Sequence, residues 1–95
     1  MKTIEFLYRD GANWKWYFHI EVSDEKFAEL EKVHGDIDEG TEMCYDEDFG
    51  ITKEEFFNER QEATGYIYEE EFDHNIIEVV GIKEDSDEPV SFTIK

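Results

Sequence analysis

Two stretches near the start of the sequence, residues 3–9 and residues 14–22, alternate between apolar and polar side chains with a period of two. The second stretch is rich in aromatic and β-branched residues, a composition typical of β-strands. Residues 10–13 (Asp-Gly-Ala-Asn) separate them and supply turn-forming residues over a length that suits a hairpin. The pattern therefore predicts a β-hairpin whose more apolar face carries Ile4, Phe6, Tyr8, Trp14, Trp16, Phe18, Ile20 and Val22.

A helix is expected directly after the hairpin, where the apolar spacing changes to three or four residues. Ser23 is a suitable N-cap, and the acidic residues that follow it favour the positive end of the helix dipole. The buried stripe would consist of Phe27, Leu30 and either Val33 or His34. The glycine at position 35 is placed to end this helix in a left-handed conformation.

A second helix has a clear start at Thr52. Thr52 and Glu55 have the three-residue spacing of a capping box, in which each side chain accepts a hydrogen bond from the other residue's backbone N–H. This helix is predicted over residues 53–63, and Gly65 is its expected stop.

Two more strands are predicted near the end of the sequence. Residues 76–82 are almost wholly apolar, and residues 90–94 alternate again. The connection between them, residues 83–89, is predicted to be a hairpin loop. Residues 36–51 resemble a loop, and residues 66–72 fit either a strand or a packed loop.

The predicted fold class is α+β, with all 95 residues in one small domain. An antiparallel sheet of about four strands would pack on two helices, and the elements would follow the order β-β-α-α-β-β.

The charge of the chain limits its partners. The sequence holds 27 acidic and 9 basic residues, a formal net charge of −18, and its mean hydropathy is −0.73. Such values are typical of disordered chains, but eight Phe, five Tyr and two Trp residues are not. We therefore expect a folded protein that binds neither nucleic acid directly nor an anionic membrane, because both would repel it.

The acidic residues are concentrated in one part of the sequence. Residues 1–22 hold three acidic and three basic residues, whereas residues 23–88 hold 24 acidic and five basic ones. Residues 36–48 contain seven acidic residues and no basic one. We expect the acidic side chains of the helices and of this tract to form a partner-binding surface that consists of Glu25, Glu29, Asp36, Asp38, Glu39, Glu42, Asp46, Glu47, Asp48, Glu55, Glu59 and Glu62.

A calcium loop is the first alternative for the acidic tract. Asp36, Asp38 and a Glu at the twelfth position, Glu47, suit Ca²⁺. However, Gly40 stands where a third oxygen ligand is needed, Thr41 stands where the turn needs glycine, and no helix follows directly. The tract is therefore read as an acidic surface loop, with weak Ca²⁺ binding through residues 36–47 kept as an alternative.

No other metal, cofactor or catalytic site is predicted. The three histidines and Cys44 never occur at the close paired spacing of a zinc site. We read His19 as an exposed strand residue, His34 as a residue at a helix C-terminus, and His74 as a turn or the start of a strand. The sequence has no glycine-rich phosphate loop and no nucleophile motif, so an enzyme is not expected.

The second face of the hairpin is a further candidate surface. It carries Leu7, Arg9, Tyr17 and His19, and it is partly apolar and close to neutral in charge. Such a face could serve as a homodimer or partner surface. The alternative is that Leu7 and Tyr17 are ordinary scattered surface residues.

A cytoplasmic location is expected. The single cysteine, Cys44, cannot form an internal disulfide, which fits a reducing compartment. The N-terminal residues lack the apolar run of a signal peptide, and no stretch approaches the ~20 apolar residues of a membrane span.

These observations favour a small acidic interaction module that binds a basic protein partner. A sharper version is a nucleic-acid mimic, because acids four apart on a helix (~6 Å) or two apart on a strand (~6.6 Å) approach the ~7 Å spacing of phosphates along a nucleic-acid strand. In size and charge alone, the chain resembles small acidic inhibitors from phages and mobile elements, including anti-restriction and anti-CRISPR proteins. The alternative is a bacterial accessory domain whose acidic surface keeps it soluble.

Overall fold

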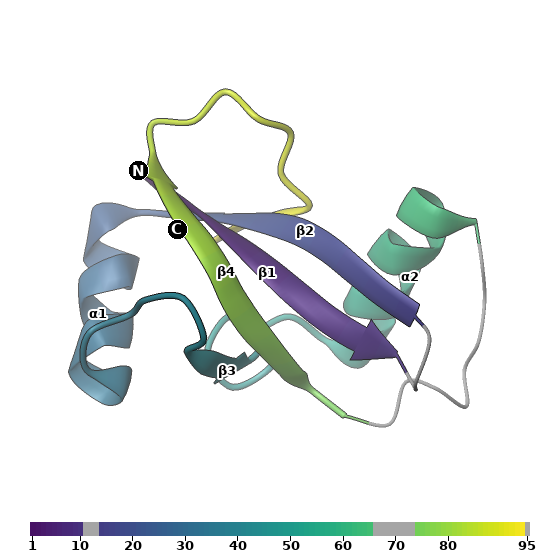
Figure 1. Ribbon diagram of the computed structural model, residues 1–95, viewed down its shortest axis with the longest axis horizontal. Coiled ribbons are helices and arrows are strands. Elements are labelled where there is room, and N and C mark those ends of the chain that lie inside the picture. Colours follow the sequence, from purple (N-terminus) through teal and green to yellow (C-terminus); the bar gives the residue numbers. More distant parts are fainter. Residues whose placement is uncertain (11–13, 66–73, 95) are drawn as a thin grey trace.

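The predicted hairpin forms the centre of the sheet in the computed structural model, which describes residues 1–10, 14–65 and 74–94 (Figure 1). Strands β1 (Lys2–Asp10) and β2 (Trp14–Val22) pair antiparallel along their whole length. The hairpin prediction is confirmed. Because successive side chains of a strand point to opposite faces, one face of this pair is apolar and the other is mixed.

In the described parts of the chain, three further strands join the hairpin in a five-stranded sheet of order β3-β4-β1-β2-β5. They are β3 (Glu42–Cys44), β4 (Ile76–Glu84) and β5 (Phe92–Ile94). β4 pairs antiparallel with β1 and with β3, whereas β5 runs parallel to β2. The prediction of about four antiparallel strands was therefore wrong in number and in the direction of β5. β3 was missed because its three residues are too few to show an alternation and their neighbours do not extend it.

The predicted hairpin between β4 and β5 is also wrong. β4 pairs with β1 and β5 pairs with β2, so the two strands lie on either side of the central hairpin. They run in the same direction, and strands of equal direction need a crossover connection instead of a tight turn. Residues 85–91 make this crossover, and the N–H of Ser91 donates to the carbonyl of His19 at 2.8 Å.

Both helices begin as predicted. In α1 (Asp24–His34), the hydroxyl oxygen of Ser23 accepts a hydrogen bond from the N–H of Lys26 at 3.1 Å. In α2 (Lys53–Thr64), both bonds of the capping box are present.

Their ends differ in conformation. Gly65 ends α2, as expected, and its conformation lies in the left-handed region (φ 76°, ψ 6°). Gly35 ends α1 with a positive φ of 78° but with ψ at −151°, so the predicted left-handed conformation was wrong in ψ.

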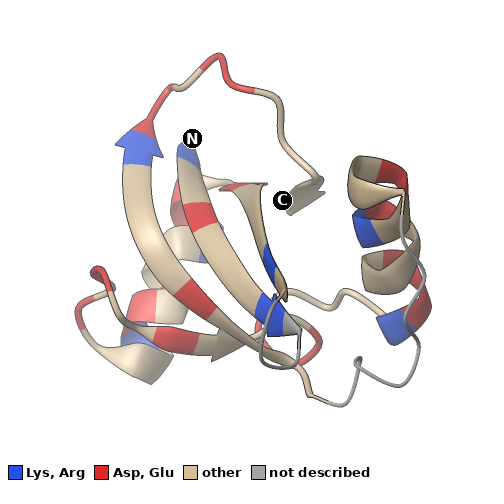
Figure 2. Cartoon of the chain, turned by 45° about the vertical axis from the view of Figure 1, so that its right-hand side comes forward, with Lys and Arg blue, Asp and Glu red and all other residues tan. Residues whose placement is uncertain are grey.

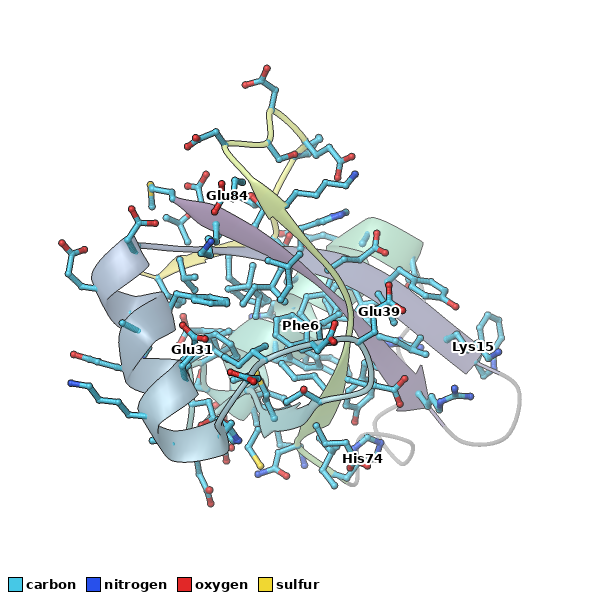
Figure 3. The ribbon with its side chains drawn as sticks, turned by 60° about the vertical axis from the view of Figure 1, so that its left-hand side comes forward. Phe6, Lys15, Glu31, Glu39, His74 and Glu84 are labelled. Carbon is cyan, nitrogen blue, oxygen red and sulfur yellow. The ribbon has the colours of Figure 1, made fainter. Side chains whose placement is uncertain are left out.

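The two helices and the segment between them cover one face of the sheet, which we call the inner face (Figure 1). From α1, Phe27 and Leu30 are buried. Val33 and His34 were the two alternatives for the third buried position. Val33 is 74% exposed, whereas His34 is half-buried. From α2, the buried apolar residue is Phe56. Figure 3 shows Phe6 of β1 among these core side chains.

The segment between the helices contributes as much to the core as they do. Its buried residues are Ile37, Met43, Tyr45, Phe49 and Ile51. The rings of Tyr45 and Phe56 stack at 4.1 Å with an angle of 7° between them. The segment predicted as a loop is thus a packed part of the domain. Residues 66–72, for which the sequence left two readings open, lie outside the described residues.

Candidate functional site

The structure places the predicted binding residues in two sets on different elements. Figures 1 and 2 show α1 and α2 at opposite ends of the sheet. One set, which we call the α1–β3 acidic group, lies on α1 and the segment that follows it and consists of Glu25, Glu29, Asp36, Asp38, Glu39, Glu42, Asp46 and Glu47. The other set, the α2 acidic group, consists of Glu55, Glu59 and Glu62. All these side chains are exposed except Glu59, which is half-buried.

Asp48, the twelfth residue, points into the protein. Its Oδ1 lies 2.9 Å from Nε2 of His34, and its Oδ2 accepts a hydrogen bond from the N–H of Cys44 at 2.8 Å. Its side chain is only 12% exposed. Asp48 therefore joins the end of α1 to the end of β3, and it is not available to a partner.

The other eleven acidic residues differ from Asp48 in their charge environment. Within residues 1–10, 14–65 and 74–94, none of them forms an ion pair. Three of them accept local hydrogen bonds from neutral groups instead. Glu55 completes the capping box, Asp38 accepts from the N–H of Glu39, and Asp46 accepts from the N–H of Glu47 and from the side-chain amide of Asn75.

The described residues contain no group of three or more His, Cys, Asp or Glu side chains arranged to hold a metal ion. In the tract considered for Ca²⁺, the carboxylates of Asp38 and Asp46 already accept hydrogen bonds from their own neighbours. This geometry does not favour the calcium alternative.

The sheet face that is turned away from the helices, here called the outer face, is partly covered by the crossover. His19 was expected to be exposed, but its side chain is only 22% exposed. Its Nε2 lies 3.2 Å from a carboxylate oxygen of Glu5 and 3.0 Å from one of Glu88 on the crossover. The ammonium group of Lys83 donates to Glu88, and this hydrogen bond lowers the pKa of the Glu88 carboxyl and raises that of Lys83.

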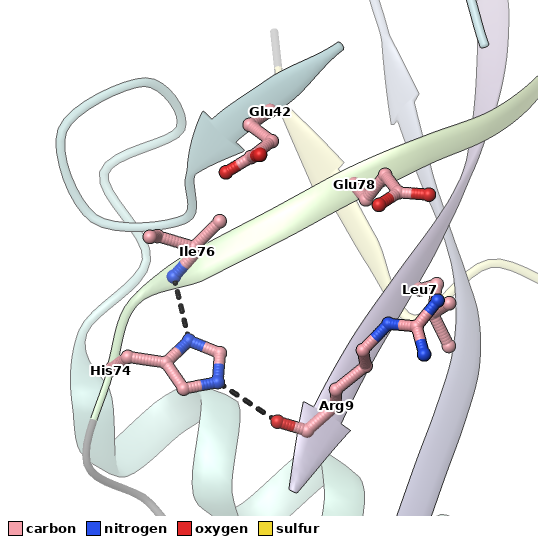
Figure 4. A pocket seen from close by; sticks show the side chains of 6 residues that line it. All are labelled: Leu7, Arg9, Glu42, His74, Ile76 and Glu78. Carbon is pink, nitrogen blue, oxygen red and sulfur yellow. Dashed lines mark hydrogen bonds between the residues drawn. The ribbon is translucent and has the colours of Figure 1, made fainter. Parts of the chain in front are cut away.

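The uncovered part of the outer face contains a pocket of about 330 Å³, shown in Figure 4. Strands β1, β3 and β4 and the residues just before β4 supply its lining, which consists of Leu7, Arg9, Glu42, His74, Ile76 and Glu78. Leu7 forms a buried floor at 4% exposure, and Ile76 is 43% exposed. The pocket therefore combines an apolar base with charged side chains at its rim.

The charges of the pocket are unbalanced. Glu42 and Glu78 are direct partners across β3 and β4, and side chains in such positions have their Cβ atoms about 4.5–5.5 Å apart. Among the described residues that line the pocket, Arg9 is the one with a basic side chain. In the described parts of the chain, neither the two glutamates nor Arg9 forms an ion pair.

His74 fixes the shape of the pocket. Its Nε2–H donates to the carbonyl of Arg9 at 2.8 Å, and its Nδ1 accepts from the N–H of Ile76 at 3.2 Å (Figure 4). The phenol of Tyr8 donates to the carbonyl of His74, and the two rings stack at 4.5 Å. Both imidazole nitrogens are thus engaged by the backbone, and His74 holds the start of β4 against the end of β1. It lies two residues before the first residue of β4, where the sequence left a turn and a strand start open.

Sequence reasoning identified only part of this pocket. It placed Leu7 and Arg9 on the second hairpin face and Glu42 among the acidic residues, but it missed His74, Ile76 and Glu78. The alternation of Ile77 and Val79 could have placed Ile76 and Glu78 on the opposite face. The pairing of β3 with β4 places Glu42 opposite Glu78. No pattern in the sequence predicts this pairing.

Cys44 lies half-buried at the end of β3. Burial raises the pKa of its thiol, and the negative charges of Glu47, Asp48 and Asp46 raise it further. A raised pKa reduces the thiolate fraction, so this environment does not activate Cys44 as a nucleophile.

Comparisons of the chain with protein-family models, with curated proteins and with solved structures found no match. In the described parts of the chain, neither helix has the length and apolar character that a membrane crossing requires. A functional proposal therefore depends on the chemistry of the surface.

Proposed function

We propose that this protein is a small acidic interaction module that binds the basic site of a protein partner, as a mimic of nucleic acid. The observation that carries the proposal is the set of eleven acidic side chains without an ion pair in the described residues. Concentrated, unneutralised carboxylates attract a cationic surface and accelerate association with it. Lys and Arg side chains of the partner would supply the missing counter-charges.

The proposal assigns the contact to the α1–β3 acidic group, because it holds eight of these eleven residues. Glu25 and Glu29 are both exposed on α1, where a separation of four residues corresponds to about 6 Å along the helix axis. Asp48 supports the same group from inside, since its bonds to His34 and Cys44 join α1 to the segment that carries the other acids.

The first experiment measures affinity against salt. Calorimetric titrations would test the protein against a panel of purified nucleic-acid-binding proteins with basic sites. A true partner should bind at least about tenfold more weakly at about 200 mM salt than at about 50 mM, because screening weakens multiple charge contacts together. Tight binding that does not change over this range would contradict the proposal.

Two matched triple variants would then locate the contact. Each replaces three acidic residues by glutamine and changes the net charge equally. The first variant is Glu25→Gln, Glu29→Gln and Glu39→Gln in the α1–β3 acidic group, and the second is Glu54→Gln, Glu59→Gln and Glu62→Gln on α2.

The first variant should weaken binding about tenfold or more, and the second should weaken it by less. Each exposed ion pair contributes about 0.2–1 kcal/mol, so three of them suffice for such a change. Equal losses in the two variants would indicate attraction by total charge alone. No loss in either, and no partner at low salt, would instead support an acidic surface that only keeps the protein soluble.

A further inference from the structure

We infer that the outer-face pocket receives one lysine or arginine side chain of the basic partner. This inference rests on the proposed function, because it takes the partner to be a basic protein. It adds a specific contact on the sheet face opposite the helices. The density of negative charge alone would not identify this place, because the pocket also contains apolar residues and Arg9.

The apolar base of the pocket suits the methylene stem of such a side chain. Leu7 is buried although it lies on the outer face, and Ile76, on the opposite side of the pocket, leaves 43% of its surface exposed (Figure 4). Long cationic side chains bury their stems on apolar surface and keep their charged ends at a polar rim. A volume of about 330 Å³ is at the lower limit of ligand pockets and is adequate for one side chain.

The rim supplies the matching charge. Glu42 and Glu78 face each other across two paired strands, and like charges in such positions destabilise a sheet. A cationic group in the pocket would reduce this repulsion and could pair with a glutamate of the rim. Binding would therefore relieve a cost that the free protein carries, which distinguishes this site from acidic residues that are merely exposed.

The remaining lining residues define the direction of the guest. Arg9 lies at the β1 side of the pocket, so its positive charge directs the cationic end of the guest toward Glu42 (Figure 4). His74 offers no free ring nitrogen, because both nitrogens bond to the backbone. The pocket thus has two anionic acceptors, an apolar base and no competing neutral donor on His74.

A titration followed by ¹H–¹⁵N NMR tests the inference with small probes. The first probe is N-acetyl-lysine amide, which carries the side chain without backbone charges. The controls are N-acetyl-norleucine amide, which has the stem but no charge, and methylammonium, which has the charge but no stem. The lysine probe should shift the backbone signals of residues 7–9, 42 and 76–78 saturably, with a millimolar dissociation constant, and each control should bind more weakly.

Variants provide the matched comparison. Glu42→Gln and Glu78→Gln should each weaken the lysine probe about twofold to fivefold, as expected for one partly exposed ion pair. Glu62→Gln on α2 makes the same change of net charge and should leave the affinity unchanged. Shifts spread evenly over all acidic residues, or equal binding of the norleucine probe, would overturn the inference.

The same variants separate this inference from the proposed function. If a basic protein partner binds and the Glu42→Gln and Glu78→Gln variants retain full affinity, the pocket inference is wrong and the proposed function stands. If the lysine probe binds in the pocket but no basic protein binds the chain at low salt, the proposed function fails and the pocket remains a site for a cationic side chain.

Discussion

The inner and outer faces of the sheet are built from the same strands but carry different chemistry. On the inner face, Phe6 and Phe18 stack at 5.7 Å within a continuous apolar core. On the outer face, their neighbours Leu7 and Tyr17 lie beside charged residues, and Tyr17 is 55% exposed. Because successive residues of a strand point to opposite faces, the residues that form the core and those that can contact a partner alternate along the same strands. The inner face forms the apolar core, and the outer face carries charged side chains, some paired, such as Lys83 with Glu88, and some without an ion pair in the described residues, such as Glu42 and Glu78.

The largest expected effect comes from the inner face. Phe56 is fully buried and contacts the rings of Tyr45, Tyr8 and Trp16. Phe56→Ala should lower the free energy of unfolding by about 3–5 kcal/mol, because it removes a large buried ring and leaves a cavity. Tyr17→Ala on the outer face should change it by no more than about 0.5 kcal/mol. Urea unfolding of both variants checks the contrast, and similar losses would show that the two faces do not differ as described.

Asp48 tests a smaller contribution from the segment between the helices. Asp48→Ala should lower the free energy of unfolding by about 1–3 kcal/mol, because it leaves the partly buried N–H of Cys44 and the imidazole of His34 without their acceptor. The control is Glu47→Ala, which removes the same charge from an exposed neighbour. If both variants unfold at the same urea concentration, Asp48 does not join α1 to β3 in the way described.

The pKa of Cys44 tests the electrostatic environment at the end of β3. Its pKa lies above the ordinary value of 9.0, so the folded protein holds the thiol proton at pH values where the unfolded chain releases it. The free energy of unfolding should therefore not depend on this thiol below about pH 8, and it should fall as the pH rises through 9. In the Cys44→Ser variant, the decrease that comes from the thiol should be absent.

Alkylation gives the direct measurement for Cys44. Iodoacetamide should modify the native protein more slowly at pH 8 than it modifies the urea-unfolded chain, since fewer thiols are ionised and the group is half-buried. Equal rates in the two states would contradict the assigned environment.

The smallest expected effect comes from the outer face. Glu78→Gln should raise the free energy of unfolding by about 0.2–1 kcal/mol, because it ends the repulsion with Glu42 across the β3–β4 pair. The gain should shrink at high salt. Glu62→Gln corrects for the general benefit of removing one negative charge. A loss of stability in Glu78→Gln would mean that the pair is already neutralised and that the two faces are less distinct than proposed.

The elements that the sequence predicted are those with strong local signals. The alternation of residues 14–22 predicted β2, and the spacing of Thr52 and Glu55 predicted the start of α2. These patterns depend on neighbouring residues, so they can be read without knowledge of the rest of the chain.

The features that the sequence did not predict depend on contacts between distant residues. β3 has three residues and exists because it pairs with β4, and β5 joins the edge of β2 because residues 85–91 cross the sheet. The inward position of Asp48 follows from the approach of His34, which is 14 residues away. The pocket needs β3 and β1 on either side of β4, so the local pattern that places Ile76 and Glu78 on one face could not supply its whole lining.

Competition with duplex DNA tests the central claim most directly. A complex of this protein with a basic nucleic-acid-binding partner would be titrated with DNA that the partner binds, and with polyglutamate at equal total charge. We expect the DNA to displace the protein at the concentrations at which that DNA binds the free partner, and we expect polyglutamate to be much less effective. Formation of a ternary complex, or equal displacement by both polymers, would contradict the claim that the acidic surface occupies the nucleic-acid site.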